Sequence, residues 1–222
     1  MIKKIILMMV ILCLAFVAKS ENRLYGGIEA GWNVSYPVDA TQAKHGFRIG
    51  VFGELQVSRL WSFDASLRLS YKPWKNSHIT NGGETWEPDL QYRKVSYSGN
   101  PYVLELPVHA AVNLSLSKDM RMNIAVGPYV GVGLFGSGKY NFYQRNTDGA
   151  ELQESDKTSD IYGDKTGDMK RFEVGVDARL GLEIKRHYLI SLGYQFQFNN
   201  PARKKTPIGQ SQIFNLSVGY KF

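Results

Sequence analysis

The sequence predicts an all-β protein, an eight-stranded antiparallel up-and-down transmembrane β-barrel with short periplasmic turns and long extracellular loops. Three observations support this prediction. Apolar and polar residues alternate with a period of two in eight segments, as in strands with one apolar face. The connections between these segments alternate strictly between long and short. The last segment, residues 213–222, ends on an aromatic residue.

The first three segments are residues 24–34, 47–57 and 61–71. Each carries aliphatic or aromatic residues at every second position, which indicates a strand with one apolar face. A segment that contains proline and aspartate, residues 35–45, separates the first strand from the second. Only residues 58–59 separate the second from the third, so that connection is a tight turn.

A long polar stretch, residues 73–100, follows the third strand, and its part 90–97 can form an extra extended piece. Alternation returns over residues 104–114 and again over residues 120–134. The break between these two strands, residues 117–119, contains Ser, Lys and Asp, which is typical of a tight turn.

The longest connection, residues 136–170, is charged and glycine-rich and shows no helical or strand periodicity. Residues 172–184 and 188–198 are the next two predicted strands, joined by a short turn over residues 185–187. A last long connection, residues 199–211, leads to the terminal strand.

The terminal strand presents an apolar face that a soluble protein has little reason to place at its end. That face consists of Phe214, Leu216, Val218, Tyr220 and Phe222. A transmembrane barrel needs a last strand that pairs with the first and shows lipid its apolar side. We therefore expect these residues to form an assembly signal for the barrel-assembly machinery. An edge strand of a soluble sandwich is the alternative for this segment alone.

The beginning of the chain has the features of a secretory signal peptide. Lys3 precedes an apolar run over residues 5–18, and small residues lie at the spacing that signal peptidase recognises, with cleavage expected after Ser20. The run is shorter than the about 20 residues that a membrane-spanning helix needs. The predicted organisation is therefore a signal peptide over residues 1–20 and a barrel domain over residues 21–222.

Loss of the signal peptide changes both the charge and the cysteine content. It removes Lys3, Lys4 and Lys19 and no acid, so the formal net charge falls from +7 to +4. The remaining excess is modest and spread along the chain, and we expect no nucleic-acid partner. The single cysteine, Cys13, also lies in this segment, so we expect no disulfide or thiol chemistry.

An even number of strands places both chain ends in the periplasm. A soluble lipocalin-type barrel also has eight up-and-down strands, but it turns its aliphatic face inward. Two predicted aromatic bands favour lipid outside instead. The outer band contains Trp32, Phe47, Tyr71, Trp74, Phe172, Phe196, Phe198 and Phe214, and the inner band contains Trp61, Phe63, Tyr188, Tyr220 and Phe222.

The polar face of the strands carries many charges, seven acids and six permanent bases. An eight-stranded barrel is just wide enough for side chains to fill, and charges buried there must be paired. We expect a lumen network that closes the barrel; a narrow ion path or an internal catalytic carboxylate is the alternative. Its members are Glu29, Arg48, Glu54, Asp64, Arg68, Glu105, Arg121, Glu173, Asp177, Arg179 and Glu183, with Lys72, His109 and Lys221 on the same face.

Signatures of an enzyme are weak. The four histidines are scattered, no metal-binding spacing occurs, and the glycines from Gly131 onward lack the Lys-Ser or Lys-Thr of a phosphate loop. Among outer-loop residues, His45 and His78 have Ser77 nearby, which is the best available nucleophile arrangement. We expect no enzyme activity, no metal and no cofactor.

Two internal motifs and the closing strand resemble a known family. The segment YVLELPVHAAVNLSL, residues 102–116, is similar to the Tyr-Leu-Glu-Ile-Pro strand of porin-like outer-membrane β-barrels, a family that includes the PorT-like proteins of Bacteroidetes-type bacteria. GPYVGVGL, residues 127–134, resembles the Gly-Pro-Tyr strand that follows there. The resemblance implies an eight-stranded outer-membrane barrel of a Gram-negative cell envelope, and it transfers no catalytic residue.

The leading hypothesis is a small outer-membrane barrel that acts through its extracellular loops in surface binding or adhesion, envelope integrity or an envelope assembly. Its expected partners are outer-membrane lipid, the barrel-assembly machinery and an envelope or host-surface molecule. Trp74, Trp86 and Tyr143 are candidate contact residues in the loops. A narrow channel or transporter is the second hypothesis, and a loop-borne outer-membrane enzyme is the third.

Overall fold

The computed structural model describes residues 23–38, 42–81, 90–158, 160–162, 169–202 and 210–222. The predicted signal peptide lies outside them. None of the described residues belongs to a helix long and apolar enough to cross a membrane. The strands are β1 (Arg23–Ser35), β2 (Lys44–Gln56), β3 (Trp61–Tyr71), β4 (Trp74–Asn81), β5 (Leu90–Ser115), β6 (Met120–Asn146), β7 (Glu151–Thr158), β8 (Phe172–Ile184), β9 (Tyr188–Gln197) and β10 (Gln212–Lys221).

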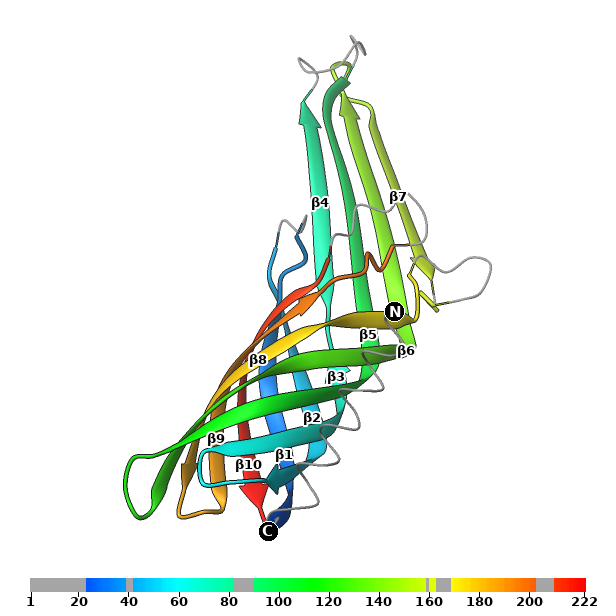
Figure 1. The fold of residues 1–222 in the computed structure, drawn as a ribbon. Helices are drawn as coiled ribbons and strands as arrows, with labels where there is room; N and C mark the ends of the chain where they lie inside the picture. Colours follow the sequence, from blue (N-terminus) through cyan, green and yellow to red (C-terminus); the bar gives the residue numbers. More distant parts are fainter. Residues whose placement is uncertain (1–22, 39–41, 82–89, 159, 163–168, 203–209) are drawn as a thin grey trace, which may run out of the picture.

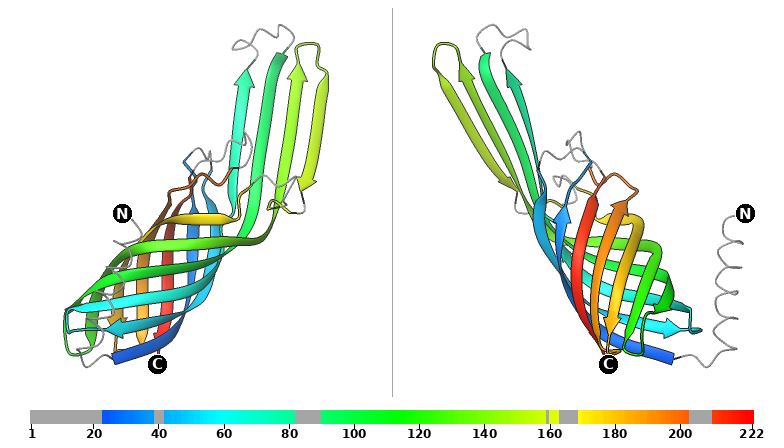
Figure 2. Two further views of the ribbon diagram at one scale, coloured as in Figure 1. Left: turned by 45° about the vertical axis from the view of Figure 1, so that its right-hand side comes forward. Right: turned by 90° about the vertical axis from the view of Figure 1, so that its left-hand side faces the viewer.

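Eight strands close into a ring in the order β1, β2, β3, β5, β6, β8, β9, β10, with β10 paired back onto β1 (Figures 1 and 2). All pairings in the ring are antiparallel. Closure brings Ala30 opposite Val218 and Val34 opposite Phe214. The ring confirms the predicted fold class.

Apolar side chains cover the outside of the ring. Ile28, Val51, Leu67, Val126, Leu180, Leu192 and Val218 are all between 47% and 58% exposed. Their sequence neighbours Glu29 and Arg68 are buried inside, because side chains alternate along a strand. This is the arrangement that lipid requires, and it excludes the soluble lipocalin-type barrel, which has the opposite polarity.

Stacked aromatic rings mark the end of the wall nearest the long connections. Phe47, Tyr71, Tyr102 and Phe135 form this outer girdle, in which Tyr102 lies 4.9 Å from Tyr71 and 4.7 Å from Phe135 between ring centroids. Tyr220 belongs to a second band at the opposite end. Because such rings prefer membrane interfaces, the two bands indicate the levels of the two membrane surfaces.

A second sheet extends beyond the outer girdle. Residues 90–100 of β5 and 136–146 of β6 continue past the rim, and β4 and β7 pair with their outer edges. This four-stranded sheet, termed the paddle, projects from the end of the barrel opposite the C terminus (Figure 1). The sequence predicted long connections here, but their described parts are largely strand. The extended piece expected over residues 90–97 is the outer part of β5, whereas β4, β7 and the outer part of β6 were not predicted, because neither face of the paddle is a continuous apolar surface.

The position of Trp74 differs from the prediction. It was expected in the outer aromatic band and as a loop contact, yet it is 6% exposed and packs with Ile161, Tyr162 and Met169. Its side chain is on the inward side of the paddle's first strand, so it covers the barrel mouth instead of facing lipid. Trp86, the other tryptophan predicted in this connection, lies outside the described residues.

Candidate functional site: the lumen and the paddle

Buried ion pairs fill the lumen near its periplasmic end. Arg121 and Lys221 lie between the carboxylates of Glu54 and Glu183. Arg121 Nη2 is 2.7 Å from Glu54 Oε1, and Lys221 Nζ is 3.1 Å from Glu54 Oε2. Four different strands contribute these groups, so the cluster links opposite sides of the wall.

The next level of the lumen contains an ion pair that is connected to a chain of hydrogen-bonded polar side chains. Arg179 contacts the Asp64 carboxylate and donates to the Asn123 oxygen at 3.4 Å. Asn123 donates to Asn113 at 3.0 Å, and Asn113 donates to Ser62 at 3.0 Å. These hydrogen bonds satisfy amide groups that would otherwise be buried without a partner.

Arg68 is the central cation of the lumen. Its Nε lies 2.5 Å from Glu29 Oε1, and its Nη1 lies 3.3 Å from Asp177 Oδ2. His109 Nε2 is 3.0 Å from the other oxygen of Asp177. Each of these side chains is at most 9% exposed, so water screens their interactions little.

Near the outer end, Glu105 accepts three polar contacts. Lys72 Nζ is 2.5 Å from one oxygen and reaches Glu173 at 2.7 Å. Ser70 donates to Glu105 at 2.5 Å, and Gln195 donates at 2.9 Å. These donors offset the cost of removing the Glu105 carboxylate from water.

Arg48 differs from the other members of the network. It is 1% exposed, and among the described residues neither its Nε nor its Nη2 has a hydrogen-bond partner. The structure therefore brings together the other ten predicted network residues in direct ion pairs, and it places Arg48 beside them without such a pair.

The lumen has little free volume. A cavity of about 30 Å³ lies beside Glu29, Asp64 and Arg179, which is room for a water molecule or two. This arrangement suits a filled barrel better than a pore.

A hydrophobic cap covers the outer mouth. It consists of Trp74, Ile161, Tyr162 and Met169, and Tyr97 packs against it. A Cβ on Gly133 would lie 2.3 Å from the Tyr162 ring, so only glycine allows this approach. Burial raises the pKa of the Tyr162 phenol, which therefore stays protonated. The sequence analysis did not identify this cap.

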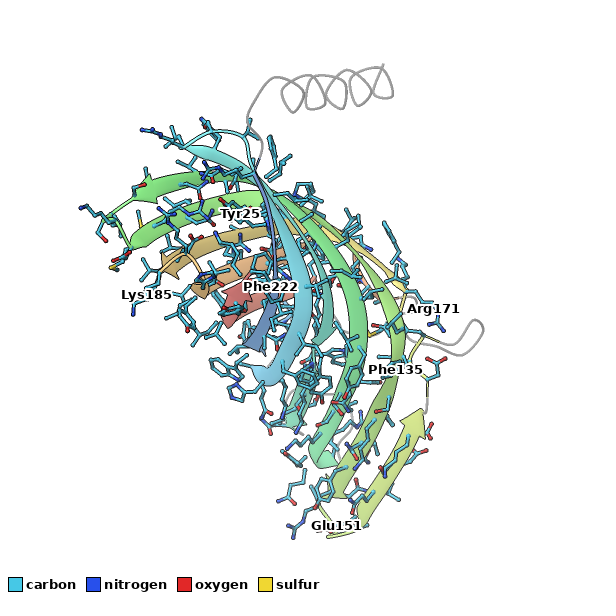
Figure 3. All side chains as sticks on the ribbon, turned by 90° about the horizontal axis from the view of Figure 1, so that it is seen from below. Tyr25, Phe135, Glu151, Arg171, Lys185 and Phe222 are labelled. Atoms are coloured by element: carbon cyan, nitrogen blue, oxygen red, sulfur yellow. The ribbon has the colours of Figure 1, made fainter. Side chains whose placement is uncertain are left out.

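The Tyr162 ring is also held by Arg171, whose guanidinium lies 5.5 Å from the ring centroid. The same guanidinium donates to the carbonyls of Gly133 and Leu134 at 3.1 and 2.9 Å. These contacts fasten the cap to β6 where the barrel becomes the paddle, close to Phe135 (Figure 3).

The two faces of the paddle differ in charge. One face continues the lipid-facing side of the wall, because Ser98 and Lys139 have the same strand parity as Tyr102 and Phe135 of the outer girdle. This outward face carries Lys75, Lys94, Lys139, Arg145 and Lys157 and a single acid, Glu151. The inward face carries Arg93, Glu154 and Asp156.

A groove of about 430 Å³ is open on the outward face. Its lining is Lys75, Tyr92, Lys94, Ser96, Asn141, Phe142, Tyr143 and Gln153. Tyr143 is the one lining residue that the sequence analysis named. The sequence analysis overlooked a pattern over residues 154–157, in which Glu154 and Asp156 alternate with Ser155 and Lys157. In a strand this alternation places the two acids on one face and the lysine on the other.

At the tip of the paddle, charges are paired instead of free. Arg145 Nε lies 3.8 Å from Glu151 Oε1, and both side chains are about half exposed. A hydrogen bond with Glu151 raises the pKa of the nearby Tyr143 phenol. Figure 3 shows Glu151 at the far end of the paddle.

His45, Ser77 and His78, the residues named for the alternative of a loop-borne enzyme, do not come together. Ser77 and His78 are consecutive in β4, so their side chains lie on opposite faces. Ser77 Oγ is instead 2.9 Å from Ser96 Oγ, and His45 stacks on Trp32 with centroids 5.2 Å apart. In the part of the chain that the structure describes, no group of His, Cys, Asp or Glu side chains could hold a metal ion.

The predicted assembly strand occupies the closing position of the ring. Leu216 is opposite Trp32 of β1, and Tyr220 is opposite Ile28. All five apolar members of this strand, including Phe222, are at least 40% exposed on the lipid side. The apolar face of the closing strand therefore belongs to the exposed outer surface of the ring.

Comparisons with known proteins place the sequence among membrane barrels. A family model described as "outer membrane protein beta-barrel domain" matches residues 20–202. No curated protein matches the sequence.

Several solved structures resemble the fold. Ail, the attachment invasion locus protein of Yersinia pestis, is 12% identical with a TM-score of 0.40, over 89% of this chain and 98% of that chain. Neisserial surface protein A is 9% identical with a TM-score of 0.44, over 91% and 98%. OprG of Pseudomonas aeruginosa is 12% identical with a TM-score of 0.30, over 90% and 95%. Likenesses of this size support no functional conclusion.

Proposed function

The chain belongs to the outer membrane protein beta-barrel domain family, and from this premise we propose that it is a closed barrel that acts by binding through its paddle outside the cell. In this proposal the barrel is an anchor, and the paddle carries the activity as a surface-binding or adhesion element toward an envelope or host-surface partner. The role is not enzymatic. Processing after Ser20 and insertion by the barrel-assembly machinery through the terminal strand complete the proposal.

One observation favours this function over transport. A groove of about 430 Å³ lies on the paddle, whereas the cavity beside the ion pairs of the lumen holds about 30 Å³. The paddle also contributes no strand to the closed ring, since β4 and β7 pair with the outer parts of β5 and β6, apart from one bridge between Lys75 and Gln42. A long, ordered sheet that the barrel does not need is expected to serve an external contact.

The direct test removes the paddle and leaves the ring. Because Lys75 faces Ser98 and Lys139 faces Lys157, residues 76–97 and 140–156 can each be replaced by an Asn-Gly turn without altering the register below. Heat-modifiable migration on gels verifies that this shortened-paddle variant still forms a barrel.

Cells that display either form are then compared for retention on surfaces coated with anionic lipid, neutral lipid or extracellular glycan. We expect the shortened-paddle variant to lose the retention that the full-length protein confers. Equal retention of both forms on every surface would refute the proposal. Steady current through the purified full-length protein in planar bilayers would favour the channel instead.

A further inference from the structure

We propose that the outward face of the paddle binds anionic, phosphate-bearing headgroups of the outer-leaflet lipid in which the barrel sits. This inference rests on the proposed function, because it assigns a ligand class to the groove of the same paddle. It begins from a row of residues that the strand register aligns across the base of the sheet.

Three lysines lie in that row. Lys75 is opposite Ser98, Ser98 is opposite Lys139, and Lys139 is opposite Lys157. Cross-strand partners are neighbours on one face, and like charges placed directly opposite destabilise a sheet. Among the described residues no acid forms an ion pair with any of the three. A bound anion would relieve this repulsion.

The row continues into the groove. Beyond it lies a second row of small hydrogen-bonding residues, including Ser96 and Asn141, and then Lys94 beside Tyr143. The groove therefore has Lys75 at its barrel end and Lys94 toward the tip of the paddle, with hydroxyl and amide groups between them. Ammonium, hydroxyl and amide donors are the groups that bind phosphate oxygens in proteins.

The height of the row identifies the source of the phosphate. Ser98 and Lys139 are each four residues beyond the outer girdle, which is about 13 Å along a strand. A strand tilted by about 45° rises about 9 Å over that length. The polar layer of a bilayer adds about 5 to 7 Å on each side of the hydrocarbon. Lysine side chains at this level can therefore reach headgroup phosphates.

The distribution of acids supports the same occupant. Glu154 and Asp156 of β7 point to the inward face, and Glu151 is at the tip, where Arg145 pairs with it. The lysines without an ion pair among the described residues thus lie on the side of the paddle that continues the lipid-facing wall, with Lys75, Lys139 and Lys157 at the headgroup level and Lys94 four residues farther out. A soluble polyanion would not require this charge to lie on the membrane side.

The experiment uses the full-length barrel, purified in a neutral detergent. It is incubated with phosphatidylglycerol or phosphatidylcholine and passed through a gel-filtration column, and retained lipid is quantified by mass spectrometry. We expect retention of phosphatidylglycerol alone, with loss in about 1 M NaCl, where the Debye length is about 3 Å.

The test variant is K75Q/K139Q/K157Q. A lysine near an anionic lipid surface contributes about fivefold to affinity, so the triple variant should bind about a hundredfold more weakly and K139Q alone about fivefold. K75R/K139R/K157R should retain the lipid. The single variant K139Q keeps the test valid if the triple variant does not fold.

The matched control is K118Q/K185Q/R186Q, which removes the same charge from the periplasmic turns. Asp119 and Glu183 lie close to Lys118 and Arg186, so these turns do not present a purely positive surface to an anionic lipid. We therefore expect the control variant to retain as much phosphatidylglycerol as the wild type.

Equal lipid retention by the wild type and K75Q/K139Q/K157Q would overturn the inference. Displacement of the lipid by inorganic phosphate or a sulfated polysaccharide at matched anion concentration would also overturn it and would indicate a soluble polyanion. If the inference fails but the shortened-paddle variant still loses surface retention, the proposed function stands and only the ligand class is wrong.

Discussion

Replacement of Arg68 by methionine should strongly destabilise the barrel. Arg68 is 2% exposed and is the sole ion-pair partner of Glu29 among the described residues, at 2.5 Å, while Asp177 retains His109 at 3.0 Å. Arg68→Met conserves most of the side-chain volume, so the main effect is one buried carboxylate without its cation. Such an unpaired charge costs about 3 to 5 kcal/mol.

This loss is large relative to the total stability of a domain, about 5 to 15 kcal/mol. The measurement is equilibrium urea unfolding of the refolded barrel in neutral lipid vesicles, with linear extrapolation to water. The double variant Arg68→Met, Glu29→Gln should recover much of the loss, because it removes the orphaned charge together with its partner.

Two further arginines serve as controls. Arg145 is about half exposed in a pair of 3.8 Å, so Arg145→Ala should cost about 1 kcal/mol or less. Arg48→Met should cost less than Arg68→Met, since two of its guanidinium nitrogens have no hydrogen-bond partner among the described residues. A loss below about 1 kcal/mol for Arg68→Met, or additive losses in the double variant, would refute the reasoning.

Other predictions concern the wall, assembly and the lumen. An arginine at Leu180 or Leu192, which are 47% and 58% exposed on the lipid side, should cost about 2 to 4 kcal/mol in the same assay, and neutral results at both would show that these positions do not meet lipid. Deletion of Phe222 should lower the heat-modifiable fraction in the outer membrane more than deletion of Thr147 in the β6–β7 turn, because closure depends on β10; equal yields would contradict an assembly role. Planar bilayers should show no sustained conductance, and an ion-selective current that Glu105→Gln alters would replace the filled lumen by a channel.

The sequence by itself determined the ring. Strand side chains alternate with a period of two, so a wall between lipid and a polar interior has to appear as alternation. Residues 188–198 show this directly, with Leu192 exposed outside and Gln195 buried inside. Short and long connections also separate the two ends of the barrel in the sequence. These features are local in the chain and are therefore readable without coordinates.

The paddle could not be predicted in the same way. Its strands have polar residues on both faces, and their stability comes from backbone hydrogen bonds between β5 and β6 that continue beyond the rim. The three-lysine row exists only through pairing of Lys75, Ser98, Lys139 and Lys157 across four strands. No periodicity within one segment reveals such a row.

The partners inside the lumen were likewise decided by tertiary structure. The sequence analysis placed the charges on one face, but it did not pair Arg68 with Asp177, which is 109 residues away, or leave Arg48 without a direct pair. Ring closure and strand register set which side chains share a level. Trp74 lies in the cap and not in the expected lipid band, because the register of β4 places it opposite Gly99 on the inward side of the paddle. Alternation assigns a residue to a face, whereas only the closed ring assigns it a neighbour.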